Sequence, residues 1–164
     1  MVTASEKDES VQLIGFYAGD RLFGVNILTV REILRDPSIE PIDDAPPFLI
    51  GCVRIRGEII PLINLRQRLS NSLPVDTQGP VWVLIATVDD RVLAFVVDSV
   101  TRILRIQMES ILPAPDLILT GLRSQYIQGV CNSELGMLIV IDLARMLGAD
   151  ENKALRKTTL PQLT

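Results

Sequence analysis

The chain has 164 residues, of which 48% are hydrophobic and only 4% aromatic, and its formal net charge is -4. No basic excess is present to neutralise phosphates, which argues against nucleic-acid binding. The apolar runs are far shorter than the roughly 20 residues of a membrane-spanning helix, and the acidic N-terminus does not resemble a signal peptide, so a cytoplasmic location is expected.

Four β-hairpins are predicted, because apolar runs rich in Ile, Val and Leu recur in pairs around short polar turns. In the second hairpin Gly57 supplies a positive φ if the turn is of a primed type. Pro61 in the same hairpin predicts that the strand is an edge at that point or that the position of the missing N–H faces solvent. In chain order the paired runs are Val11–Ala18 with Leu22–Val25, Ile50–Ile55 with Glu58–Leu65, Val81–Val88 with Arg91–Val97, and Gln128–Ser133 with Met137–Leu143.

The remaining segments are predicted to be connections, tails and short helical turns. Residues 1–10 are expected to be a disordered N-terminal tail, and residues 149–164 a C-terminal tail that begins as a helix. Pro37–Pro47 and Asn71–Pro80 are polar and proline-containing, which is typical of surface connections. Short helical turns are expected after the last strand of the second and fourth hairpins, at Leu65–Leu69 and Leu143–Leu147.

The sequence also contains an internal repeat. Gly19–Arg35 shifted by 70 positions falls on Asp89–Arg105, with six identities, and Gly51–Leu69 shifted by 78 falls on Gly129–Leu147 with its apolar register kept. The two offsets place a short insertion in the second copy, within Gln107–Gln125. The repeat predicts an all-β protein of two similar lobes, about 11–75 and 80–148, each closed into a small barrel, with the exchange of a strand between them left open.

No catalytic site is predicted. The chain has no histidine, which excludes Ser-His-Asp triads, Cys–His pairs and HExxH zinc sites. It has no phosphate-binding glycine loop and no calcium-loop spacing. Cys52 and Cys131 are expected to be reduced, half-buried thiols, and Asp89-Asp90 a solvated hairpin turn. We therefore expect a binding protein without a metal or cofactor.

Candidate binding positions are polar residues and glycines among the apolar strands. Arg56 lies at a hairpin tip, where it is either solvated or available to a partner. Gly51 and Gly129 are equivalent strand glycines, which mark a bulge or the close approach of another backbone. Ile27 and Val30 are either core residues or contact residues. Glu32 is expected to need a partner if it is buried. All six residues lie within the repeated segments.

Several runs of the chain resemble the signatures of CheW-like domains. Leu22–Ile33 resembles the first signature, and Gly51–Arg66, with its Arg-Gly turn, proline and terminal Leu-Arg, resembles the second. The series continues in order with Phe95–Asp98 followed by Val100, then Leu112–Pro115, Tyr126–Gly129 and Ile141–Leu143. The resemblance covers roughly residues 11–148.

This resemblance implies a fold of two SH3-like five-stranded barrels side by side, and a free-standing, non-enzymatic adaptor. Its partners would be the cytoplasmic tip of a chemoreceptor and the regulatory domain of a CheA-type histidine kinase, and it would reach the membrane arrays only through them. By resemblance, the groove between the lobes would involve Ile27, Val30, Glu32, Gly51, Arg56, Val100 and Gly129.

Two residues depart from the family pattern. Arg54 stands where the family usually has Asn, and Asn64 where it usually has Asp. The first departure leaves open an adaptor of a divergent system, such as one for type IV pilus twitching, gliding or surface sensing. A small β-barrel nucleic-acid binder is a further alternative, but it would need a basic face with stacking aromatic residues.

Overall fold

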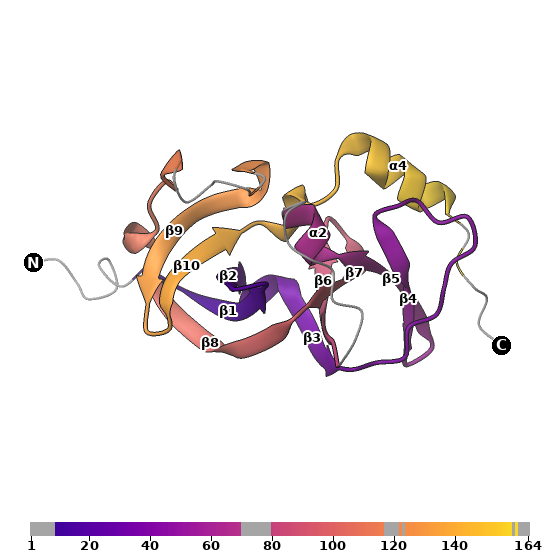
Figure 1. Cartoon of the computed structure of the whole chain (residues 1–164), viewed down its shortest axis with the longest axis horizontal. Coiled ribbons are helices and arrows are strands. Elements are labelled where there is room, and N and C mark those ends of the chain that lie inside the picture. The colour runs from indigo at the N-terminus through magenta and orange to yellow at the C-terminus, as the bar shows by residue number, and fades with distance from the viewer. Residues whose placement is uncertain (1–8, 70–79, 117–121, 123, 159, 161–164) are drawn as a thin grey trace, which may run out of the picture.

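The computed structural model describes residues 9–69, 80–116, 122, 124–158 and 160. These residues form ten strands in two five-stranded sheets, so the predicted all-β class is confirmed (Figure 1). The strands are β1 Ser10–Ala18, β2 Arg21–Asn26, β3 Val30–Arg35, β4 Leu49–Ile55, β5 Glu58–Asn64, β6 Trp82–Val88, β7 Arg91–Val97, β8 Ser99–Gln107, β9 Ile127–Ser133 and β10 Gly136–Ile141. The helices are α2 Leu65–Leu69 and α4 Ala149–Lys157, with 3-10 turns η1 Ile27–Thr29, η2 Met108–Ser110, η3 Ser124–Tyr126 and η4 Leu143–Arg145.

All four predicted hairpins form, and the β4–β5 turn has the positive φ that was expected at Gly57. Arg56 and Gly57 both have positive φ angles, of 48° and 82°, as do Asp89 and Asp90 in the β6–β7 turn. Positive φ at both central residues is the requirement of a type I′ turn, whose twist matches that of the strands. Pro61 lies on β5 just before that strand begins to pair with β7 at Leu62, so the strand is locally an edge there.

Each sheet draws strands from both halves of the chain. We call the sheet β8-β1-β2-β10-β9 lobe A, and the sheet β3-β6-β7-β5-β4 lobe B. The first hairpin of each sequence repeat thus joins the last three strands of the other repeat. The lobes therefore do not coincide with the segments 11–75 and 80–148 that the repeat suggested, and a whole hairpin is exchanged.

The two lobes have the same strand order and register when each strand of the first repeat is replaced by its counterpart in the second. Ile14 lies opposite Ile103 in lobe A, and their counterparts Leu84 and Ile33 lie opposite each other in lobe B. The parallel pairs agree as well, with Val140 opposite Gly24 in lobe A and Leu62 opposite Ala94 in lobe B. The sequence offsets of 70 and 78 therefore relate equivalent positions of the two lobes.

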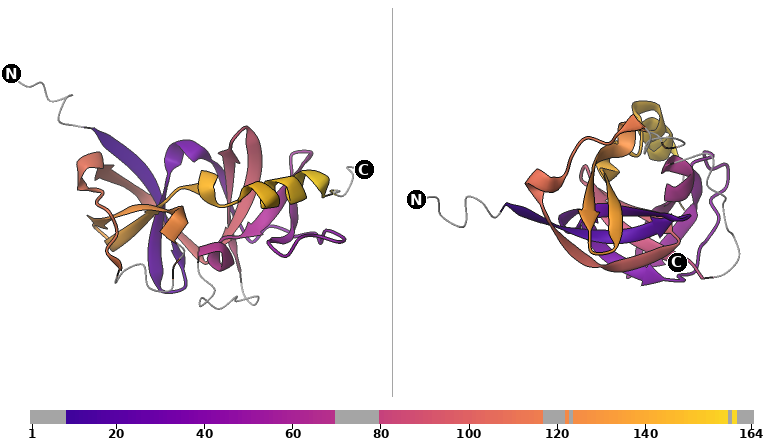
Figure 2. Two further views of the ribbon diagram at one scale, coloured as in Figure 1. Left: turned by 90° about the horizontal axis from the view of Figure 1, so that it is seen from above. Right: turned by 60° about the vertical axis from the view of Figure 1, so that its left-hand side comes forward.

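The sheets curve so that their edge strands approach each other, as the strands of lobe A do in the right-hand view of Figure 2. Among the described residues, side-chain ion pairs and not a backbone ladder join these edges. In lobe B, Arg56 of the β4–β5 turn pairs with Glu32 of β3, and Arg31 of β3 pairs with Glu58 of β5. In lobe A, Arg102 of β8 pairs with Glu134 of the β9–β10 turn. We call each such junction a seam.

The core explains why the lobes form one unit. One small cluster of buried residues belongs to lobe A and includes Leu13, Leu104 and Leu138. A second, with Val53 and Val83, belongs to lobe B. The largest cluster takes residues from both sheets and from the helical turns. Small sheets bury little apolar surface alone, and the shared cluster supplies the missing burial.

The C-terminal segment does more than a tail would. Helix α4 leaves lobe A after β10 and lies over lobe B (Figures 1 and 2). Its Leu155 is 7% exposed and belongs to the shared core. The predicted helical turns appear as α2 and η4. Most of the predicted N-terminal tail and nearly all of the connection Asn71–Pro80 lie outside the described residues.

Candidate functional site

Ile27, Val30 and Val100 lie where the chain crosses from one lobe to the other. Asn26, whose side chain accepts a hydrogen bond from the backbone N–H of Leu28, begins the turn that leads from β2 of lobe A to β3 of lobe B. Val100 lies at the start of β8, which follows β7 of lobe B and enters lobe A. All three predicted residues are half-buried and pack against the shared core.

Glu32 and Arg56 form the seam of lobe B. The Arg56 Nη2 and Glu32 Oε1 atoms are 3.0 Å apart, and the arginine side chain is 75% exposed while the glutamate side chain is 25% exposed. Arg31 and Glu58 form a second pair beside them, with two N···O distances of 3.2 and 3.3 Å. The structure thus gives Glu32 the partner that burial requires, and leaves most of Arg56 in solvent.

The seam of lobe A holds the same pair with its charges reversed. Arg102 is the counterpart of Glu32, and Glu134 is the counterpart of Arg56. Both side chains are largely exposed, at 60% and 77%. Exposed ion pairs contribute roughly 0–1 kcal/mol to the free energy of unfolding. The main consequence of the seam pairs is therefore which charge each lobe presents on its surface.

Gly51 and Gly129 have a structural explanation. Glu40 forms a two-way backbone bridge with Cys52, and a Cβ atom on Gly51 would clash with the Glu40 carbonyl oxygen. A Cβ atom on Gly129 would lie 2.6 Å from the carbonyl oxygen of Leu112, which bridges Val130 in the same way. The close backbone approach is therefore made by the chain itself, at the edge strands β4 and β9.

The seven predicted residues thus fall into three groups. The crossover residues lie between the lobes, the Glu32–Arg56 pair lies on the seam of lobe B, and the two glycines lie on strands toward opposite ends of the molecule (Figure 1). Val30 of the first group and Glu32 of the second both lie on strand β3. This strand therefore connects the crossover residues to the seam of lobe B.

The charged residues that join the lobes were not predicted from sequence. Arg68 of α2 donates to Glu151 of α4 through two N···O contacts of 2.6 Å, to the Tyr126 hydroxyl at 2.7 Å, and to the Met146 carbonyl. Its position between Leu65 and Leu69 in a five-residue helix gave no local signal of burial. Only the tertiary structure brings η3, α4 and the Met146 carbonyl to it.

Asp98 forms a second junction between the lobes. Its carboxylate accepts hydrogen bonds from Arg66 of α2 and from the backbone N–H of Gly19 in the β1–β2 turn, while its own N–H donates to the Tyr17 carbonyl. Asp98 and Arg66 both belong to the runs that resemble the family signatures. Their presence in those runs was the signal that the sequence offered for these two residues. The contact between their side chains explains why both runs contain a charged residue there.

The two departures from the family pattern are accommodated locally. Arg54 pairs with Glu40, Nε to Oε1 at 2.6 Å, and this hydrogen bond raises the pKa of the guanidinium. The Asn64 side chain accepts from the backbone N–H of Gln67 at 3.2 Å, and its counterpart Asp142 accepts from Ala144 at 2.9 Å. Both therefore cap the helical turn that follows, a role that Asn and Asp share.

The cysteines are free and buried, as Cys52 is 0% and Cys131 4% exposed. Burial raises the pKa of the Cys52 thiol; the Glu40 carboxylate raises it further, and Arg54 opposes this. Burial alone raises the pKa of the Cys131 thiol. Both remain protonated near neutral pH and are poor nucleophiles. The described residues contain no cluster of three metal-ligating side chains, and none of their helices is long and apolar enough to cross a membrane.

Comparison with known proteins gives a consistent answer. Residues 12–151 match the CheW-like domain. The chain is 31% identical over 153 residues to the chemotaxis protein CheW of Treponema pallidum, covering 92% of this chain and 89% of that one. It is 32% identical over 136 residues to CheW of Klebsiella aerogenes, covering 83% and 81%.

A solved structure agrees with the fold. The scaffolding protein TtCheW from Thermoanaerobacter tengcongensis superimposes with a TM-score of 0.75 at 25% identity, over 86% of this chain and 94% of that one. Proteins of this family are adaptors or scaffolds and not enzymes. The repeat, the exchanged hairpins and the matched residues lead to one conclusion: the chain belongs to the CheW-like domain family.

Proposed function

We propose that the chain is an adaptor that couples the cytoplasmic tips of chemoreceptors to the regulatory domain of a CheA-type histidine kinase. The observation that carries the proposal is the match to the CheW-like domain over residues 12–151. Relatives named as chemotaxis proteins are covered over most of their length. The adaptor would work in the cytoplasm and reach the membrane arrays through its partners.

The arrangement of the lobes supports this proposal. A scaffold must hold two surfaces in a fixed relation, and the shared core joins both sheets into one unit. The lobes have equivalent backbones but present different side chains, so one fold offers two distinct surfaces. Charge complementarity at such surfaces contributes more to partner choice than to raw affinity, and the reversed seams are a place where the lobes differ in charge.

The receptor-facing surface that we propose is the junction formed by Ile27, Val30 and Val100, bordered by Glu32 and Arg56. The three apolar side chains are partly accessible, and the Arg56 guanidinium is the most exposed charge beside them. Gly51 and Gly129 remain in the proposal as residues that shape the surface, because they allow the segments at Glu40 and Leu112 to cross the sheet edges.

Titration calorimetry with a CheA regulatory domain and with a receptor cytoplasmic fragment tests the proposal. The unsubstituted chain should bind both. Arg56→Ala should weaken association with at least one of them about tenfold, which corresponds to about 1.4 kcal/mol. Arg102→Ala is the matched control, since it removes an exposed arginine from the equivalent seam pair of lobe A.

The outcomes separate two conclusions. Failure of the unsubstituted chain to bind either partner would contradict the adaptor function itself. Normal binding by Arg56→Ala, with both partners bound by the parent, would instead make Arg56 a solvated turn residue. An equal loss in Arg102→Ala would show that overall charge, and not the position of Arg56, controls association.

A second candidate is an adaptor of a divergent motility system, such as twitching, gliding or surface sensing. The chain is 35% identical over 101 residues to protein FrzA of Myxococcus xanthus, covering 61% of this chain and 62% of that one. The Arg54–Glu40 pair changes the charge next to β4 relative to the usual family residue. Copurification of the tagged chain from its native cells, with identification of the kinase and receptor recovered, would distinguish the two systems.

A further inference from the structure

A cavity lies beneath α4, away from the crossover residues and the seams. Its volume is about 330 Å³, and it is bounded by the β6–β7 turn, by η4 and by one face of α4. Its floor is apolar and made of Leu93, Leu143 and Leu147, which are all buried. Its rim carries Asp89 from the turn together with the cationic side chains Arg91, Lys153 and Arg156.

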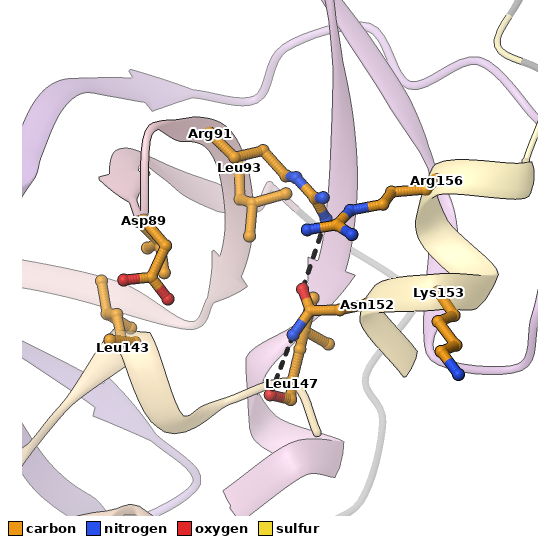
Figure 3. Close-up of a pocket in the computed structure, with 10 residues that line it drawn as sticks. Asp89, Arg91, Leu93, Leu143, Leu147, Asn152, Lys153 and Arg156 are labelled. Atoms are coloured by element: carbon orange, nitrogen blue, oxygen red, sulfur yellow. Dashed lines mark hydrogen bonds between the residues drawn. The ribbon is translucent and has the colours of Figure 1, made fainter. Parts of the chain in front are cut away.

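Two guanidinium groups lie together at this rim. Figure 3 shows Arg91 and Arg156 reaching toward each other from β7 and α4. Arg91 donates from Nη1 to Oδ1 of Asn152 at 3.3 Å, and the Asn152 amide is itself held by the Gly148 carbonyl at 3.1 Å. Within the described part of the chain, neither arginine forms an ion pair with a carboxylate.

Like charges at close range repel, so an unneutralised arginine pair is unfavourable by itself. An anion between the two guanidiniums would replace that repulsion by two charge-assisted interactions, and the planar donor forks of arginine match a carboxylate. The chain as a whole carries a net charge of -4. A local excess of cations above an apolar floor therefore has the composition of a binding site for an amphiphilic anion.

Asp89 restricts how such a ligand would lie. Its carboxylate is on the side of the cavity opposite the two guanidiniums (Figure 3). A bound anion would therefore stay at the arginine end, and the body of the ligand would cover the leucine floor. Lys153 also lines the cavity but extends away from the two guanidiniums (Figure 3), so it adds positive charge without reaching the same point.

We propose that this cavity binds a carboxylate that carries a short aliphatic group. Arg91 and Arg156 hold the carboxylate, Asn152 orients Arg91, and Leu93, Leu143 and Leu147 contact the aliphatic part. The same chemistry occurs in a free short-chain acid and at the carboxyl end of a peptide that finishes in an aliphatic residue. This cavity shares no lining residue with the receptor-facing surface proposed above.

Nuclear magnetic resonance of the full, isotope-labelled chain tests the proposal, with arginine Nε–Hε and backbone amide signals as the readout. Hexanoate should produce saturable shifts at Arg91, Arg156 and Leu93, and should bind at least about fivefold more tightly than acetate because only hexanoate covers the floor. Acetyl-Gly-Leu with a free carboxylate, compared with its amide, tests the peptide source. Tighter binding of the peptide than of hexanoate would assign a peptide carboxylate; the reverse would assign a free acid.

Arg156→Gln and Lys153→Gln form a matched pair, since each removes one positive charge from an exposed position of the same helix. Arg156→Gln should weaken hexanoate binding about tenfold, Lys153→Gln less than twofold, and Asp89→Asn should strengthen it. Thermal unfolding checks that each variant remains folded. The proposal is overturned by an absence of saturable shifts, by equal losses in the two helix variants, or by equal affinities for hexanoate and acetate.

Discussion

Lobe A and lobe B place equivalent strands in equivalent registers. At their seams, however, the positive and negative residues of the ion pair exchange positions. Glu32 pairs with Arg56 in lobe B, and Arg102 pairs with Glu134 at the same place in lobe A. The paired positions are equivalent in the two lobes, whereas the charges at those positions are exchanged. This difference shows how a duplicated fold can keep its backbone and still present distinct surfaces to different partners.

The cores of the lobes also differ at equivalent positions, where a change in the size of one residue is accompanied by a change in its neighbour. Gly24 packs against Leu138 in lobe A, where a Cβ atom on the glycine would lie 3.1 Å from Leu138 Cδ2. Their counterparts in lobe B are Ala94 and Ile60, which both belong to the lobe B core. The helical turns differ more, because Arg68 of α2 corresponds to Met146, and Arg68 itself binds the Met146 carbonyl.

The largest expected effect comes from Gly51→Asp, which breaks the edge of lobe B. The new Cβ atom would meet the backbone of Glu40, and a carboxylate would be forced next to a carbonyl oxygen. We expect a loss of about 3 kcal/mol or more in the free energy of unfolding, measured by urea denaturation. Gly129→Asp should act similarly in lobe A.

Ile50→Asp is the control for this prediction, because Ile50 is the neighbouring residue on β4 and is 42% exposed. It should cost clearly less than Gly51→Asp. Equal stability of the two variants would show that the segment at Glu40 moves aside readily, and would return Gly51 to the set of direct partner contacts.

The next largest effect is expected for Arg68→Met, which gives α2 the residue found at the equivalent place in the second repeat. The substitution leaves Glu151, the Tyr126 hydroxyl and the Met146 carbonyl without a buried donor. We expect a loss of about 2 kcal/mol and faster proteolysis near α4. Glu151→Gln keeps one acceptor and should cost less. A change below about 0.5 kcal/mol in Arg68→Met would mean that α4 is held by apolar contacts alone.

A transplant of the lobe B core pair into lobe A should have an intermediate effect. Gly24→Ala alone brings a methyl group against Leu138 and should cost about 1 to 2 kcal/mol. Adding Leu138→Ile reproduces the Ala94–Ile60 pair of lobe B and should recover at least about 0.5 kcal/mol of that cost. A thermodynamic cycle of the four chains measures this coupling. Purely additive values would show that the two pairs are unrelated.

The smallest effect on stability is expected at the seam. Glu32→Arg combined with Arg56→Glu gives lobe B the polarity of lobe A, and should stay within about 0.5 kcal/mol of the parent. Glu32→Arg alone places two arginines together and should cost more at low salt than at high salt. Urea denaturation at both salt concentrations measures this. A large, salt-independent loss in the double variant would show that the seam has a structural role beyond charge.

Much of the fold followed from local patterns. The paired apolar runs predicted all four hairpins, and the offsets of 70 and 78 predicted which positions of the two repeats are equivalent, as the matching registers of the two lobes confirm. Asn64 and Asp142 lie at the predicted starts of the helical turns. These features depend on neighbours in the chain, so the sequence alone carries them.

The candidate site was less accessible to such reasoning. Glu32 was expected to need a partner, but its partner, Arg56, is far away in sequence and meets it only because the sheet curves. Gly51 and Gly129 were expected to mark a bulge or a close approach of another backbone, and the structure has a register shift next to each as well as the close approach. The approaching backbone could not be identified from the sequence. Arg68 gave no local signal at all, because its partners come from three other segments.

The sequence by itself determined that two similar sets of strands exist and which residues of the two sets correspond. The tertiary structure decided which copy each hairpin joins. An internal repeat gives a strand two partners with the same register, and local patterns cannot choose between them. The choice depends on the crossover at η1, where Asn26 and Val30 both keep extended backbone angles, with ψ of 126° and 124°. There the chain runs on into the other sheet, where the shared core can bury the apolar faces of both lobes.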